Sequence, residues 1–181
     1  MDDQAVRHAD RAEGTPTAGS DLDFLARLST GLPRIQRIAR LLTGDEFAAE
    51  DLVAEAIARS LPRWRSGQVA DASSYVRAVV VHLASARWRR RALSGRRDHF
   101  ALSWLATADD HAQVLSERDR TLRALMKLPM RRRAVVVLRF YGDLTEQQIA
   151  DELGISVGTV KSQLSRALEQ LRVDLDTLEG T

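Results

Sequence analysis

Residues 144–167 read LTEQQIADELGISVGTVKSQLSRA, and this stretch decides the fold that we expect for the second half of the chain. Thr145 caps a short amphipathic helix, Gln148 completes a capping box, and Gly154 suits the left-handed turn that ends the helix. Ser156 caps a second helix directly afterwards. Two short helices joined by a glycine-containing turn indicate a helix-turn-helix, whose second helix enters the major groove of DNA.

The outward face of this second helix is polar. If Val160 and Leu164 face the core, five side chains point away from it: Thr159, Lys161, Ser162, Gln163 and Arg166. Side chains of these types suit phosphates and base edges. A helical hairpin with a solvated polar face is the alternative, and the spacing favours DNA binding over it.

Two further helices are predicted just before the helix-turn-helix. Apolar residues recur at helical spacing over 122–128, and Pro129 ends that pattern. A second apolar pattern covers 131–141. Together these four helices make a small helical domain that we place at residues 119–175, followed by a tail at 176–181.

The first half of the chain is also predicted to be helical. Gly31 and Pro33 interrupt its first apolar pattern and should either kink this segment or divide it into two helices. The next helix is expected over 46–61, with an apolar stripe that begins at Phe47 and a stop at Pro62.

An arginine-rich segment ends the third predicted helix of this half, which starts near 71–74. Residues 87–97 contain six arginines and no acid. Arginines that track a backbone beside aromatic rings that stack on bases can hold single-stranded nucleic acid. The members of this cluster are Trp64, Tyr75, Arg77, Arg87, Trp88, Arg89 and Arg90. In the alternative, Trp64 and Tyr75 are core residues and the arginines form a solvated helix end.

Acidic residues gather on the helix predicted over 46–61, at Glu50, Asp51 and Glu55. Asp51 and Glu55 lie one turn apart on one face. No histidine lies nearby, so a metal site or an acid/base pair is disfavoured. A solvated face or a protein-binding face is expected instead.

Composition excludes several classes of function. The 181 residues are 44% hydrophobic and include no cysteine, which rules out disulfides, cysteine zinc sites and thiol catalysis. No run is long and apolar enough for a membrane span, and a cytoplasmic protein is expected. No nucleophile, metal constellation or glycine-rich phosphate loop is present in the sequence, so we expect neither an enzyme nor a cofactor.

The net charge of +2 conceals an uneven distribution. Residues 21–97 carry +6 and residues 121–172 carry +4, while the remaining segments are acidic. Periodicity is absent over 1–20 and fades over 98–118, which predicts a disordered tail and a flexible linker. The fold class that follows is all-α, with two small basic helical domains at 21–97 and 119–175.

The order of the motifs resembles that of the bacterial RNA polymerase sigma factors. The matching motifs are AEDLV at 49–53, RWRRR at 87–91, LPxxxRxVxxLRFY at 128–141 and LGISVGTVKS at 153–162. The resemblance covers about residues 21–173. It is to the small extracytoplasmic-function type, which keeps only sigma regions 2 and 4, and within it to the actinobacterial SigE branch.

This resemblance implies a sigma factor that binds core RNA polymerase, through its beta and beta-prime subunits, and directs promoter-specific initiation. The residues at core-polymerase positions are Glu50, Asp51, Leu52 and Glu55. Those at minus-ten positions are Trp64, Tyr75, Arg77, His82, Arg87, Trp88, Arg89 and Arg90. The minus-thirty-five positions are Thr159, Lys161, Ser162, Gln163 and Arg166. An anti-sigma factor, which restrains many relatives, is a partner that the sequence leaves open.

Three residues depart from the common family pattern: Ala54 replaces a glutamine, and His82 and Ala86 stand where many relatives have asparagine and aspartate. Minus-ten specificity therefore cannot be copied from better-known members. A stand-alone helix-turn-helix regulator is the alternative function, and it would bind a palindromic operator as a dimer without polymerase. A polymerase-sequestering antagonist is a third class.

Overall fold

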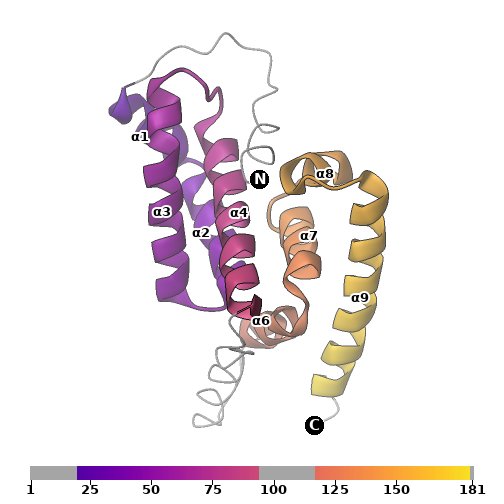
Figure 1. Ribbon diagram of the computed structural model, residues 1–181. Helices are drawn as coiled ribbons and strands as arrows, with labels where there is room; N and C mark the ends of the chain where they lie inside the picture. Colours follow the sequence, from indigo (N-terminus) through magenta and orange to yellow (C-terminus); the bar gives the residue numbers. More distant parts are fainter. Residues whose placement is uncertain (1–19, 94–116, 180–181) are drawn as a thin grey trace.

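The computed structural model describes residues 20–93 and 117–179 as a set of packed α-helices (Figure 1). The N-terminal half (residues 20–93) contains α1 (Asp21–Ser29), α2 (Leu32–Thr43), α3 (Glu46–Arg65) and α4 (Ala72–Leu93). The C-terminal half (residues 117–179) contains α6 (Glu117–Lys127), α7 (Met130–Phe140), α8 (Glu146–Leu153) and α9 (Val157–Glu179). No strand occurs in these two ranges, which confirms the all-α prediction, and none of their helices is long and apolar enough to cross a membrane.

In the N-terminal half, α3 packs against both α2 and α4. The break between α1 and α2 falls where the sequence predicts it, because Pro33 lies in the first turn of α2, where a missing N–H leaves no bond unmade. Asp45 caps α3 as its side chain accepts a 2.7 Å hydrogen bond from the Ala48 amide.

Helix α3 continues through Pro62, which we expected to end it. A proline removes one backbone hydrogen bond, so the extra turn needs another source of stability. Trp64 supplies it: its ring lies 5.6 Å from that of Phe24, and its indole nitrogen donates to the Ser20 carbonyl at 3.1 Å. Burial of this large side chain outweighs the lost hydrogen bond.

In the C-terminal half, the predicted helix-turn-helix is confirmed as α8 and α9. Both hydrogen bonds of the Thr145–Gln148 capping box are present, and Gly154 adopts a left-handed conformation with φ 64°. The hydroxyl of Ser156 accepts from the Thr159 amide at 3.1 Å, which fixes the start of α9.

The boundaries of the C-terminal half differ from the predicted ones at both ends. Helix α6 starts at Glu117, inside the predicted linker 98–118. Helix α9 runs to Glu179, although we expected a tail from 176, because its apolar spacing continues beyond Leu171 to Leu175 and Leu178. Most of the predicted linker and the predicted tail 1–20, apart from Ser20, lie outside the described residues.

The two halves pack directly against each other. Helices α7 and α8 contact α4, and α6 and α7 contact α2 (Figure 1). Buried side chains from both halves form one hydrophobic cluster, with Val76 and Val80 of α4 in the same cluster as Val135 of α7 and Ile149 of α8. The halves that the sequence predicts as separate domains therefore share a core in this structure.

Candidate nucleic-acid interface

Helix α9 presents its predicted DNA-reading side chains to solvent. Lys161, Ser162 and Arg166 are exposed, and Thr159 and Gln163 are partly exposed. Val160 is fully buried, as the spacing predicts. The helix thus offers a polar face at its N-terminal end, which is the part of a recognition helix that meets base edges.

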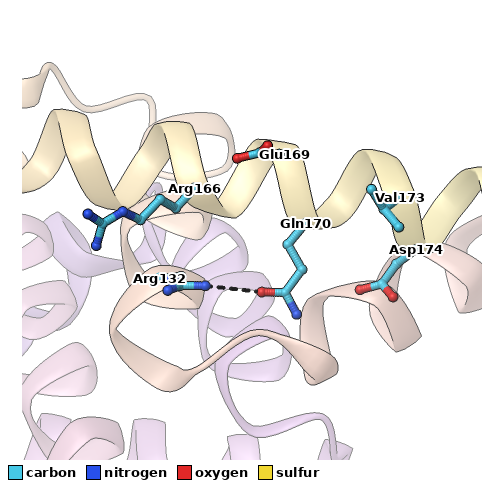
Figure 2. Close-up of a pocket in the computed structure, with 6 residues that line it drawn as sticks. All are labelled: Arg132, Arg166, Glu169, Gln170, Val173 and Asp174. Carbon is cyan, nitrogen blue, oxygen red and sulfur yellow. Dashed lines mark hydrogen bonds between the residues drawn. The ribbon is translucent and has the colours of Figure 1, made fainter.

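Neighbouring groups orient this face. Glu146 of α8 lies 3.7 Å from the Lys161 ammonium, and the Ser162 hydroxyl donates to the Thr159 carbonyl at 3.0 Å. Arg166 lines a shallow groove between α7 and α9, in which Arg132 donates to Gln170 at 3.2 Å (Figure 2). Figure 2 shows Arg166 on one side of this hydrogen bond and the acidic Asp174 on the other.

Helix α3 carries an exposed patch formed by Phe47, Glu50, Asp51 and Ala54, which we call the α3 patch. We expected Phe47 in the apolar core stripe, but its side chain is 79% exposed. The spacing to Glu50 and Asp51 is three and four residues, which places Phe47 on their face of the helix. That spacing is the signal by which the sequence could have revealed it.

Leu52, a predicted polymerase-binding residue, belongs to the core. It is fully buried, because it lies on the opposite face of α3 from the α3 patch. Its side chain therefore cannot touch a partner in this conformation, and its predicted role as a polymerase contact is wrong for this structure.

Glu55 is committed to ion pairs within the N-terminal half. Its two carboxylate oxygens lie 2.6 Å from Arg59 and 2.6 Å from Arg87, respectively. The hydrogen bond from Arg87 lowers the pKa of Glu55, against the opposing effect of partial burial. Glu55, a predicted polymerase contact, and Arg87, a predicted minus-ten contact, thus neutralise each other's charge.

The aromatic and arginine cluster divides into a buried part and an exposed part. Trp64 is 3% exposed and Tyr75 is 5% exposed, so neither ring can stack on a base in this conformation. The alternative in which they are core residues is the correct one here. Trp88, Arg89 and Arg90 are exposed at the far end of α4.

His82 and Arg77 lie on α4 between these two parts. His82 is partly buried. Arg77 faces the C-terminal half, where its guanidinium donates to the carboxylate of Glu152 on α8 at 3.1 Å. The sequence did not predict a role for Glu152, because no local pattern links residues 75 positions apart. Only the packing of the two halves brings them together.

These features define a class of protein. A helix-turn-helix with an exposed polar recognition helix is joined to a basic helical bundle, and both are suited to DNA. The class is that of a helical DNA-binding transcription factor.

Comparison with known proteins assigns the family. The sigma-70 region 2 model matches residues 29–93, and the sigma-70 region 4 model matches residues 118–171. The RNA polymerase sigma-E factor of Streptomyces avermitilis is 34% identical over 164 residues, which is 88% of this chain and 88% of that protein. The ECF RNA polymerase sigma factor SigL of Mycobacterium tuberculosis is 35% identical, over 80% of this chain and 84% of that protein.

A solved structure has the same fold. The sigma factor RpoE from Bartonella quintana, in complex with the anti-sigma factor NepR, matches 85% of this chain and 97% of that chain with a TM-score of 0.67 and 19% identity. The chain belongs to the extracytoplasmic-function RNA polymerase sigma factors. Members of this family bind core RNA polymerase and direct it to promoters as transcription initiation factors.

Proposed function

We propose that the α3 patch docks on core polymerase, that the exposed end of α4 contacts the minus-ten element, and that α9 reads the minus-thirty-five element. The protein contributes no catalytic group of its own, and the polymerase carries out the chemistry. Core polymerase, through its beta and beta-prime subunits, and promoter DNA are the proposed partners, which implies action in the cytoplasm. An anti-sigma factor would act as a competitor of polymerase.

One observation carries the proposal for α9. Its five predicted contact residues are all at least partly exposed, while Val160 and Ala167 are buried beneath them. An exposed row of lysine, arginine, hydroxyl and amide groups suits phosphates and base edges. Nothing in the described ranges covers this face.

Residues of the α3 patch support the docking proposal in a different way. An exposed Phe47 beside Glu50 and Asp51 joins an apolar anchor to negative charge. Aromatic side chains, phenylalanine included, are enriched at protein interfaces, and neighbouring charges at the rim contribute to the choice of partner. Glu55 lies beside this patch but is engaged by Arg59 and Arg87, so we assign it a supporting role.

Run-off transcription with core polymerase tests both assignments. Arg166→Ala should weaken minus-thirty-five recognition by about 1 to 3 kcal/mol, while Arg172→Ala, an exposed arginine further along α9, should not. Asp51→Arg should lower affinity for core polymerase, and Gln36→Arg on the exposed surface of α2 serves as its control.

The outcomes separate the candidate functions. Unchanged promoter selectivity in Arg166→Ala would contradict the proposal that α9 reads the minus-thirty-five element. If Asp51→Arg and the wild type co-purify equally with polymerase, the proposal that the α3 patch docks on core polymerase is wrong. Tight binding to a palindromic site as a dimer, without polymerase, would instead establish the stand-alone regulator.

A further inference from the structure

One ion pair lies within the proposed DNA-reading surface. The Lys161 ammonium of α9 is 3.7 Å from the Glu146 carboxylate of α8, and these two helices pack against each other (Figure 1). The Lys161 side chain is 65% exposed and the Glu146 side chain is 35% exposed. We call this contact the recognition ion pair.

Local structure fixes the position of both partners. Glu146 is the first residue of α8, directly after its cap Thr145, and the capping box holds this end of the helix. The start of α9 is held by its own cap, because the Thr159 amide donates to the Ser156 hydroxyl at 3.1 Å. The recognition ion pair is therefore carried by the capped N-terminal ends of two helices and not by loops.

Lys161 is important for the charge of this surface because cations are sparse there. It is the only lysine or arginine in residues 157–165, and Arg166 follows more than one helical turn later. The Glu146 carboxylate therefore balances the whole positive charge that the side chains of this stretch provide. The N-terminal end of the recognition helix meets DNA with little net side-chain charge.

Folding stability does not explain this arrangement. An exposed ion pair contributes little to stability, because water screens both charges. An acid in the first turn of α8 is favoured by the helix dipole, but that effect does not require contact with Lys161. The contact itself points to a role in DNA binding.

Glu146 and DNA phosphates compete for Lys161. A lysine that binds a phosphate releases a counterion, and such contacts supply nearly all of the affinity of proteins for DNA of arbitrary sequence. With Glu146 at 3.7 Å from Lys161, a phosphate bound by the same ammonium would lie within about 7 Å of the carboxylate, closer than the Debye length of about 10 Å at 0.1 M salt. The repulsion between the two anions is therefore only partly screened.

A base edge at Lys161 meets no such repulsion. The O6 and N7 atoms of guanine accept hydrogen bonds from lysine and carry no net charge. Glu146 thus disfavours the phosphate contact, which is the same at every sequence, more than the base contact, which depends on sequence.

We propose that Glu146 is a specificity-determining residue, which keeps Lys161 from DNA phosphates and leaves it for base edges of the minus-thirty-five element. A genome offers about 10⁶ or more competing non-specific sites, so weaker binding to each of them leaves more protein for promoters. This inference rests on the proposed function, because it requires α9 to bind DNA.

Fluorescence anisotropy with the full chain tests the proposal, using a random-sequence duplex of about 30 base pairs at salt concentrations from about 50 to 200 mM. Glu146→Gln should bind this duplex about three to ten times more tightly than the wild type. The dependence of log K on log salt should steepen by up to about one unit, because one phosphate contact is gained. The gain should be smaller on a duplex from a promoter that the wild type transcribes in the run-off assay.

Two further variants separate the recognition ion pair from general charge effects. Asp151→Asn removes a negative charge from the same helix, where this carboxylate accepts from Gln147 at 3.0 Å, and should bind random DNA like the wild type. In the Lys161→Ala background, Glu146→Gln should have little effect on affinity. A role of Glu146 in the helix dipole alone would leave the salt dependence unchanged, and circular dichroism verifies that each variant folds.

The results distinguish this inference from the proposed function. Unchanged affinity and salt dependence in Glu146→Gln would overturn the inference, as would an equal gain in the Lys161→Ala background or an equal gain on both duplexes. The proposed role of α9 would still stand if Lys161→Ala and Arg166→Ala weaken promoter binding. If neither of these two variants weakens it, the proposed role of α9 is wrong and the inference is wrong with it.

Discussion

Trp64 and Trp88 are the same residue type in the same half of the protein, and the structure gives them different roles. Trp64 is 3% exposed and packs on Phe24, whereas Trp88 is 42% exposed. We predict that Trp64→Ala lowers the free energy of unfolding by about 3 to 5 kcal/mol, because it leaves a cavity and removes the hydrogen bond from the indole to the Ser20 carbonyl. Trp88→Ala should change it by no more than about 0.5 kcal/mol.

Urea unfolding followed by circular dichroism measures both values. Binding of fluorescent single-stranded DNA to the polymerase complex supplies the second readout, in which Trp88→Ala should weaken binding because a stacking surface is lost. A stable Trp64→Ala variant with impaired promoter melting would contradict the division between core and contact residue.

The ion pair of Glu55 with Arg87 leads us to expect that the free energy of unfolding depends on pH. Its pKa is lowered from the usual 4.5 by the hydrogen bond from Arg87, so its ionised form is stabilised by folding. The resulting stability is fully present above pH 4.5 and is lost as the pH falls through the lowered pKa. Glu55→Gln should therefore be less stable than wild type at pH 7, and the difference should shrink in strongly acidic solution.

Paired urea titrations at pH 7 and at pH values below 4.5 check this expectation. Glu50→Gln, an exposed acid of the same helix, is the matched control. Because Asp21 also has a lowered pKa through its bond to Arg65, the comparison is made between variant and wild type at each pH. A difference independent of pH would show that Glu55 acts through packing rather than charge.

At the scale of the element, helix α8 depends on its N-terminal cap. The Thr145 side chain accepts from the Gln148 amide, and the Gln148 side chain accepts from the Thr145 amide at 2.9 Å. Thr145→Ala removes half of this box and should lower the free energy of unfolding by about 1 kcal/mol. Thr145→Ser keeps the hydroxyl and should retain most of the stability, as measured by thermal or urea denaturation.

Elements with strong local signals could be predicted from the sequence. The Thr145 cap, the Gly154 turn and the Pro33 break each follow from the chemistry of one or two residues, and each is present in the structure. The passage of α3 through Pro62 could not be predicted, because it depends on Trp64 reaching Phe24. Only the spacing of three and four residues to Glu50 and Asp51 indicated that Phe47 is exposed, against the apolar character of its own side chain.

The candidate site could also be predicted only where a local sequence pattern determines it. Exposure of Lys161, Ser162 and Arg166 follows from helical periodicity alone. The occupation of Arg77 by Glu152 does not, since it arises from packing between halves that local patterns present as independent.

At the scale of the whole molecule, the shared core predicts cooperative unfolding. One hydrophobic cluster includes Leu52 of α3 and Ile149 of α8. Amide hydrogen exchange in the centres of these two helices should therefore report the same free energy of opening in the free protein. In Glu152→Gln, α8 should exchange at a lower free energy than α3. Different values in the wild type would indicate two independently folding halves.

Because Arg77 is a predicted minus-ten contact, its ion pair with Glu152 links the packing of the two halves to the binding of the two proposed partners. If polymerase favours the separated halves and promoter DNA does the same, each ligand raises the affinity for the other by one common factor, because coupling free energies are reciprocal. Under that condition, breaking the contact between Arg77 and Glu152 would make the affinity of the protein for polymerase depend on the DNA sequence to which the complex binds.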